Sequence, residues 1–185
     1  MKLNQPKSLF ATGLLALLLC LGHSAQAQCD TYKAEDAEKA VKSLQTAIKY
    51  LAKIDKSKTL AYIAKASGYW KKVQRYIPDR LGTYTDHYNS IIDQTNDDIE
   101  TLVDGYYDLR SGGTCSSCDG AIRRIMKNQR NVDTALEGIL VELEWGRDSE
   151  GCIYEAQAQA NQLFKEAQQV IKYYQDAKSK QHTRG

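Results

Sequence analysis

The sequence predicts an all-α protein, an up-and-down antiparallel bundle of four to five helices that disulfide bonds staple together. Apolar residues recur at three- and four-residue steps through nearly all of the chain beyond residue 30, and the alternating pattern typical of strands is absent. Beyond residue 27 only one proline remains, Pro78, which suits long helices with few turns. Polar or glycine-rich stretches separate the periodic segments, and long helices joined by short turns pack as antiparallel neighbours.

The apolar pattern divides into five segments. The first two meet at the polar stretch DKSKT (55–59), where Ser57 or Thr59 is expected to cap the second helix. The second segment ends at Pro78, because proline disfavours helical geometry in the residue before it. Together the segments cover residues 31–55, 60–77, 83–109, 122–143 and 153–174.

The N-terminal residues 1–27 have the features of a cleaved secretory signal peptide. Two lysines precede a short apolar core, residues 14–22, and the small residues Ala25 and Ala27 form a cleavage pattern. The apolar core is shorter than the roughly 20 residues that a membrane-spanning helix needs. We therefore expect cleavage after Ala27 and export to the periplasm or the extracellular medium, without a membrane-spanning segment.

The rest of the chain is expected to form one helical-bundle domain over residues 28–177, followed by a polar, flexible tail over 178–185. Removing residues 1–27 takes away two lysines and no acid, so 23 basic residues then face 23 acidic ones. A neutral, exported chain without a recognition motif is not expected to bind nucleic acid.

Four cysteines remain once Cys20 leaves with the signal peptide, and an even number in an exported chain predicts disulfides. Helix directions alternate in an up-and-down bundle, which places Cys29 and Cys152 at one end and Cys115 and Cys118 at the other. We therefore expect the pairs Cys29–Cys152 and Cys115–Cys118. If the chain from 31 to 77 were one unbroken helix, the ends would exchange and Cys152 would have no partner.

The motif Cys115-x-x-Cys118 has several chemical interpretations. Covalent haem attachment needs a histidine where Asp119 stands, and a four-cysteine zinc site needs all four thiols at one end of the bundle. Thiol–disulfide exchange is an alternative, because a helix N-terminus and the nearby Arg123 and Arg124 would stabilise a thiolate, although Asp119 opposes it. The favoured interpretation is a local clamp on the loop, with no metal site and no cofactor.

The second segment is basic and aromatic. Residues 56–78 contain six basic residues and no acid, with tyrosines and lysines each repeating at seven-residue steps. The third segment, 83–109, contains seven acids and no lysine or arginine, so the favoured explanation is charge pairing between neighbouring helices. The alternative is a binding face for an anionic envelope surface, a glycan or an acidic protein. Its candidate residues are Tyr62, Lys65, Tyr69, Lys72, Arg75 and Tyr76, with Trp145 as a separate contact candidate at the end of the fourth segment.

No known catalytic motif is present. Only His87 and His182 remain after cleavage, and His87 beside Asp86 points to a different side of a helix. We expect a non-enzymatic exported protein that binds another macromolecule, such as an inhibitor, immunity or adaptor protein with a protein partner. The alternatives are a thiol–disulfide protein that uses Cys115 and Cys118, and an envelope- or glycan-binding module that uses the basic second helix.

Overall fold

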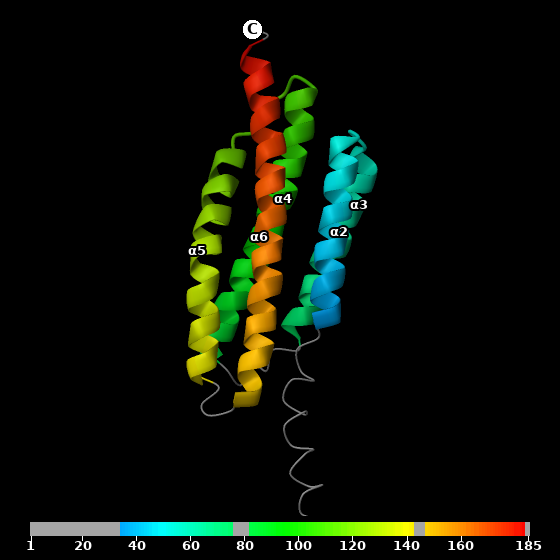
Figure 1. Ribbon diagram of the computed structural model, residues 1–185. Coiled ribbons are helices and arrows are strands. Elements are labelled where there is room, and N and C mark those ends of the chain that lie inside the picture. Colours follow the sequence, from blue (N-terminus) through cyan, green and yellow to red (C-terminus); the bar gives the residue numbers. More distant parts are fainter. Residues whose placement is uncertain (1–33, 76–81, 143–146, 184–185) are drawn as a thin grey trace, which may run out of the picture.

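The computed structural model describes residues 34–75, 82–142 and 147–183, and these residues form five helices and no strand (Figure 1). The all-α fold that the sequence predicts is confirmed. The helices are α2 (Ala34–Ala52), α3 (Lys56–Gln74), α4 (Gly82–Arg110), α5 (Cys118–Glu142) and α6 (Arg147–His182).

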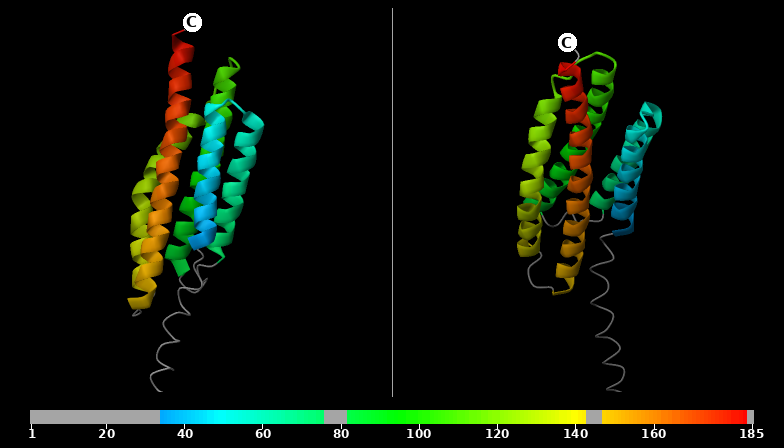
Figure 2. Two further views of the ribbon diagram at one scale, coloured as in Figure 1. Left: turned by 45° about the vertical axis from the view of Figure 1, so that its right-hand side comes forward. Right: turned by 45° about the horizontal axis from the view of Figure 1, so that its top comes forward.

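The helices run alternately up and down along one axis, which confirms the expected topology (Figures 1 and 2). The helices α2 and α3 form a hairpin, and α4, α5 and α6 pack around one another beside it. The hairpin joins the other three helices along two edges, where α2 contacts α6 and α3 contacts α4. One broad surface of the hairpin therefore faces away from the rest of the bundle.

The core lies along the inner faces of all five helices. Its largest fully buried side chains include Trp70 of α3, Tyr88 of α4, and Phe164 and Tyr174 of α6. The apolar stripe of α3 is buried, since both Ile63 and Trp70 lie in the core. Tyr62 and Tyr69, each one position earlier in the sequence, lie at the edge of this stripe and are half-buried.

The turn between α2 and α3 confirms that residues 34–74 form two helices. The Asp55 N–H donates to Tyr50 O and the Ile54 N–H donates to Leu51 O, both at 3.0 Å, the hydrogen-bond pair of a Schellman motif. Ile54 has a φ of 61°, in the left-handed region that this motif requires.

The helix cap differs from the expectation. Asp55, rather than Ser57 or Thr59, is the N-cap of α3, and its Oδ1 accepts a hydrogen bond from the Lys58 N–H at 3.1 Å. The sequence pattern had assigned Asp55 to the preceding helix, which ends three residues earlier than expected. Thr59 is instead buried, and its hydroxyl lies 3.2 Å from the hydroxyl of Tyr107 in α4.

The prediction of a flexible tail from residue 178 is wrong for residues 178–182, because α6 continues to His182. Two contacts hold this part of α6 against the first turn of α5 and the loop that precedes it. Lys178 Nζ lies 2.8 Å from Asp119 Oδ1, and Gln181 donates to Gly113 O at 3.0 Å. Polar composition suggested a free end, whereas the α4–α5 loop and the first turn of α5 supply partners for it.

Candidate functional site: a lysine–tyrosine groove on the α2–α3 hairpin

A polar groove runs between α2 and α3 on the outer surface of the hairpin. Its volume is about 220 Å³. The lining side chains are three lysines, two tyrosines and two hydroxyl residues: Lys39, Lys42, Ser43 and Thr46 from α2, and Tyr62, Lys65 and Tyr69 from α3. Three of the sequence candidates therefore lie together in one site.

The helical repeat explains this arrangement. Residues three, four and seven apart lie on one face of a helix, and the groove residues of α2 follow that spacing from 39 to 46. On α3 the same spacing connects Tyr62, Lys65 and Tyr69, one position before the buried stripe that contains Ile63 and Trp70. Burial of that stripe turns the tyrosines and lysines toward α2 and the solvent.

Each lysine of the seven-residue row on α3 lies over a tyrosine ring. The Nζ atom is 5.1 Å from the Tyr50 centroid for Lys58, 5.8 Å from Tyr62 for Lys65, and 5.1 Å from Tyr69 for Lys72. The Tyr50 and Tyr62 rings are themselves stacked, with centroids 5.6 Å apart and an interplanar angle of 15°. These six residues form a continuous series, which we call the lysine–tyrosine track.

The hairpin carries the net positive charge of the described chain. Residues 34–75 contain ten basic and four acidic residues, whereas α4 contains seven acids and one arginine. Among the described residues, a single ion pair joins α3 to α4, between Lys56 Nζ and Asp104 Oδ1 at 3.4 Å. The favoured expectation, charge pairing along the edges of these two helices, thus holds at one position, and the other charges of α3 face elsewhere.

Two lysines of the groove have acidic neighbours within α2. Lys39 lies 2.6 Å from Glu35, and Lys42 lies 3.1 Å from Glu38. The hydrogen bond that Lys39 donates to Glu35 raises the pKa of Lys39 above its ordinary value, so this ammonium stays charged at neutral pH. Both pairs are exposed to solvent, where such pairs contribute little to stability.

Of the other binding residues that the sequence suggested, the structure describes only some. Arg75 is exposed at the C-cap of α3, while Tyr76 and Trp145 lie outside the described residues. The sequence pattern did not single out the four groove residues that α2 contributes. These residues, from Lys39 to Thr46, follow helical spacing, but their position beside Tyr62 depends on how the hairpin packs.

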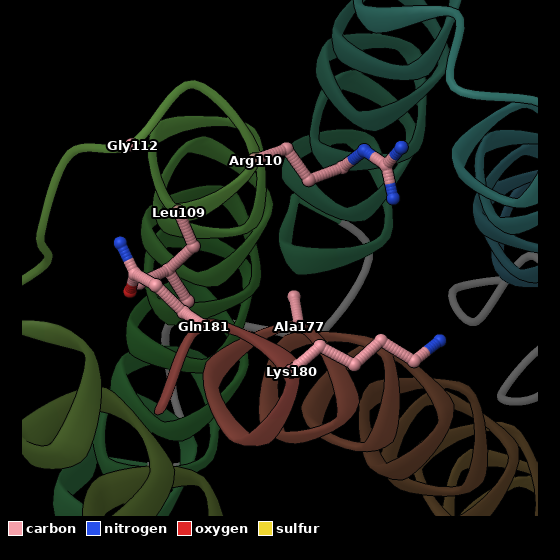
Figure 3. A pocket seen from close by; sticks show the side chains of 6 residues that line it. All are labelled: Leu109, Arg110, Gly112, Ala177, Lys180 and Gln181. Atoms are coloured by element: carbon pink, nitrogen blue, oxygen red, sulfur yellow. The ribbon is translucent and has the colours of Figure 1, made fainter. Parts of the chain in front are cut away.

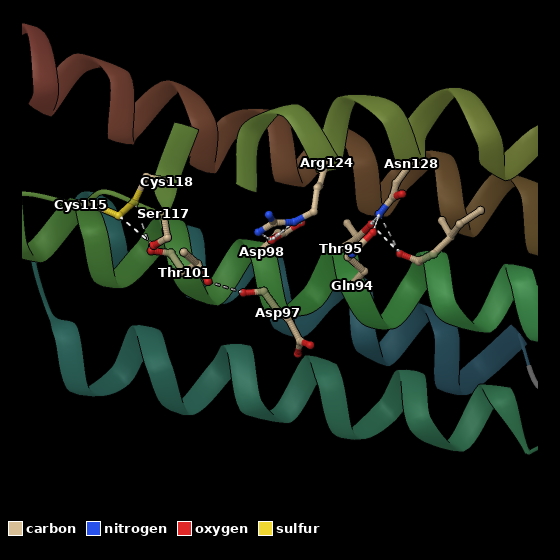
Figure 4. A network of polar contacts seen from close by, with 11 residues as sticks. Gln94, Thr95, Asp97, Asp98, Thr101, Cys115, Ser117, Cys118, Arg124 and Asn128 are labelled. Carbon is tan, nitrogen blue, oxygen red and sulfur yellow. Dashed lines mark hydrogen bonds and ion pairs between the residues drawn. A yellow bond between two sulfur atoms is a disulfide. The ribbon is translucent and has the colours of Figure 1, made fainter. Parts of the chain in front are cut away.

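Cys115 and Cys118 form a disulfide at the end of the bundle where α4 is followed by α5, as expected (Figure 4). Cys118 is the first residue of α5 and is fully buried, and Cys115 is half-buried. Both sulfur atoms lie against Gly105 of α4. A Cβ atom built on Gly105 would clash with Cys118 Sγ and approach Cys115 Sγ to 2.8 Å.

The charged residues near this disulfide have other partners. Arg124 donates to the buried carboxylate of Asp98, with the closest contact at 2.6 Å, and this bond raises the pKa of Arg124 (Figure 4). Asp119 binds Lys178, and that hydrogen bond lowers the pKa of Asp119. Arg124, one of the cations expected to stabilise a Cys118 thiolate, is therefore held by a carboxylate of α4. This arrangement favours the loop clamp over thiol–disulfide exchange.

The second expected disulfide, Cys29–Cys152, stays a prediction. Cys29 and the side chain of Cys152 lie outside the described residues. The helices α2, which begins after Cys29, and α6, which contains Cys152, start at the same end of the bundle and contact each other (Figure 1).

A second concave site lies where α4 and α6 end (Figure 3). Its volume is about 250 Å³, and its lining includes Leu109, Arg110, Ala177 and Lys180. The side chains of Arg110 and Lys180 extend to the same side in Figure 3. The site has two cations and no aromatic side chain among its lining residues. It therefore offers a ligand fewer kinds of interaction than the groove, which has lysines, tyrosines and hydroxyl groups.

The two histidines take no part in either site. His87 is exposed on α4, and the His182 ring lies 3.1 Å from Lys178 O within α6. Within the part of the chain that the structure describes, no cluster of three metal-binding side chains occurs. None of the described helices has both the length and the apolar character needed to cross a bilayer.

Comparison with protein families, characterised proteins and solved structures finds no match to this chain.

Proposed function

We propose that the protein is an exported, non-enzymatic binding protein, and that the outer surface of its α2–α3 hairpin contacts a negatively charged macromolecular partner. The observation that carries this proposal is the lysine–tyrosine groove. Its lysines, aromatic rings and hydroxyls are groups that recognise a ligand by charge and stacking.

The state of the lysines supports a binding role for this surface. Within the described chain, Lys65 and Lys72 have a tyrosine ring beside them but no carboxylate partner. The acids of α4, which are the nearest internal alternative, meet α3 by ion pairing only at Lys56. Fields of one sign at a surface chiefly guide and select charged partners, and contribute little to folding.

The test is affinity capture from the native envelope and culture medium with the immobilised mature protein. Wild type is compared with Lys65→Glu/Lys72→Glu, two exposed positions of α3. We expect the variant to lose the captured partner while its circular dichroism and melting temperature stay close to those of wild type. The matched control is Lys127→Glu/Lys165→Glu, at exposed positions of α5 and α6.

The control variant should retain the partner. Equal capture by the hairpin variant and wild type would show that the partner binds elsewhere and would overturn the proposal. Loss of folding in the hairpin variant alone would instead show that its lysines stabilise the bundle, which the single α3–α4 ion pair argues against.

A further inference from the structure

We infer that the partner of the groove is an acidic polysaccharide, an extended chain of sugars that carry carboxylate or sulfate groups, lying along the α2–α3 hairpin. This inference rests on the proposed function and specifies the chemistry of the partner. It depends on the spacing of the lysine–tyrosine track, on the chemistry of the groove and on its concave form.

The track repeats at a distance that suits a sugar polymer. Lys58, Lys65 and Lys72 are seven residues apart, which places them about 10.5 Å apart along the helix axis. Tyr62 and Tyr69 repeat at the same distance. Two pairs follow this repeat within α3, Lys65 over Tyr62 and Lys72 over Tyr69, so two acidic sugars of one extended chain can each meet such a pair. Lys58 differs, because it lies over Tyr50 of α2 and 3.4 Å from Asp55 Oδ2.

The groove offers separate partners for the polar and the apolar parts of a sugar. Ammonium groups bind acidic substituents, and tyrosine rings present flat apolar edges and faces. The Ser43 and Thr46 hydroxyls donate to carbonyls one helical turn earlier, at 2.7 and 2.8 Å, and their remaining lone pairs can accept from sugar hydroxyls. Glu35 and Glu38, which bind Lys39 and Lys42, bring negative charge to one side of the groove.

The form of the site favours a polysaccharide over other anionic partners. A flat bilayer surface would reach the exposed lysine ends but would not contact hydroxyls that line a groove between two helices. An acidic protein helix would need an apolar stripe to pack into, and the groove is lined by lysines, tyrosines and hydroxyl residues. A slender, polar, negatively charged chain can contact the hydroxyls within the groove and needs no apolar stripe.

The test uses the mature protein and fluorescently labelled polygalacturonate, with heparin as the sulfated probe and dextran as the neutral one. Fluorescence anisotropy at low salt should show saturable binding of an acidic polymer, none of dextran, and weaker binding as salt is added. The stronger of the two acidic polymers identifies the preferred acid group. With galacturonate oligomers, affinity should rise with length and level off once the chain spans the track from Lys58 to Lys72, about 21 Å.

Variants locate the site. Lys65→Ala/Lys72→Ala should weaken binding about tenfold, since each exposed charge pair contributes at most about fivefold. Tyr69→Ala should weaken binding and Tyr69→Phe should retain it, because the ring and not the hydroxyl makes the contact. The control Lys127→Ala/Lys165→Ala removes the same charge from α5 and α6 and should change affinity less than twofold.

Several outcomes overturn this inference, and they differ from the outcome that would overturn the proposed function. Equal weakening by the hairpin and control variants, or equal binding of dextran, shows that no sugar-chain site exists on the hairpin. Stronger binding to phosphatidylglycerol–phosphatidylcholine vesicles than to either acidic polymer identifies a membrane surface instead. If neither polymer binds while native capture still depends on Lys65 and Lys72, the partner is another anionic molecule. The proposed function fails only if the capture experiment does not depend on the hairpin.

Discussion

Gly105 is the residue against which the Cys115–Cys118 disulfide packs, because a side chain at this position of α4 would clash with both sulfur atoms. The sequence predicted the disulfide from the spacing of its cysteines and from the alternation of helix directions. It gave no indication of the role of Gly105, which depends on how the loop folds back onto α4.

We expect Gly105→Ala to lower the free energy of unfolding by about 1–3 kcal/mol, the usual cost of overpacking. The matched control is Gly68→Ala in α3, where an added Cβ has no neighbour within 4 Å. That change should raise stability by about 0.5–1 kcal/mol, because alanine is the better helix former. Urea unfolding measures both. A Gly105→Ala protein as stable as wild type would show that the disulfide does not pack on α4.

Asp98 is a buried carboxylate that depends on one partner. Its side chain is 4% exposed, and Arg124 reaches it with both Nε and Nη2. Arg124→Met should destabilise the protein by about 2–4 kcal/mol, since it leaves a buried charge unpaired. The exposed neighbour Arg123→Met should change stability by less than about 0.5 kcal/mol. Thermal and urea unfolding report both values, and equal effects of the two variants would contradict the assignment.

The turn between α2 and α3 was predicted in its position but not in its geometry. The DKSKT stretch correctly predicted a break between two helices, because polar residues interrupt the apolar repeat. It did not predict the Schellman geometry, since the left-handed position of such a turn is usually glycine and here is Ile54. The N-cap was missed for the same reason, as the end of α2 was placed too late.

Ile54→Gly should raise the free energy of unfolding by about 1 kcal/mol. A β-branched residue at φ 61° is strained, and its side chain is 49% exposed, so little burial is lost when it is removed. The control is Ala52→Gly at the end of α2, which should lower stability by about 0.5–1 kcal/mol. Urea unfolding separates the two signs. A loss of stability in Ile54→Gly would mean that the Ile54 side chain makes a contact that outweighs the strain.

At the scale of the whole molecule, the repeat of apolar residues was sufficient to predict an all-α bundle of four to five helices with alternating directions, and the described residues form five. The groove was predicted only in part, because Tyr62, Lys65 and Tyr69 belong to one segment whereas Lys39 and Lys42 come from another. Charge composition suggested that α3 and α4 neutralise each other. Composition does not specify which face of a helix carries its charges, and the buried stripe of α3 turns most of them outward.

Burial of tyrosines gives the bundle a predictable response to alkali. Burial raises the pKa of Tyr88, Tyr107 and Tyr174 above the ordinary value of tyrosine. A group whose pKa is raised by folding contributes its full stability below its unfolded pKa, about 10, and loses it as the pH rises through the folded value. Stability measured by urea unfolding should therefore fall above pH 10.

Tyr88→Phe tests this response. The Tyr88 hydroxyl has no hydrogen-bond partner among the described residues, so its removal should change stability at pH 7 by less than about 1 kcal/mol. The loss above pH 10 should become smaller in the variant. An unchanged alkaline profile would show that Tyr88 does not contribute to it.

The uneven charge of the bundle also affects how the protein meets its partner. With an excess of positive charge on the hairpin and of negative charge on α4, the molecule has an electric dipole across its width. Near a negatively charged polymer, this dipole turns the hairpin toward the partner before the two touch, so a larger share of collisions is productive. Added salt should therefore slow association more than it speeds dissociation, which stopped-flow measurements can resolve. The same dipole turns α4 away, and the exposed acids of α4, such as Asp97 and Glu100, remain in contact with solvent after the partner has bound.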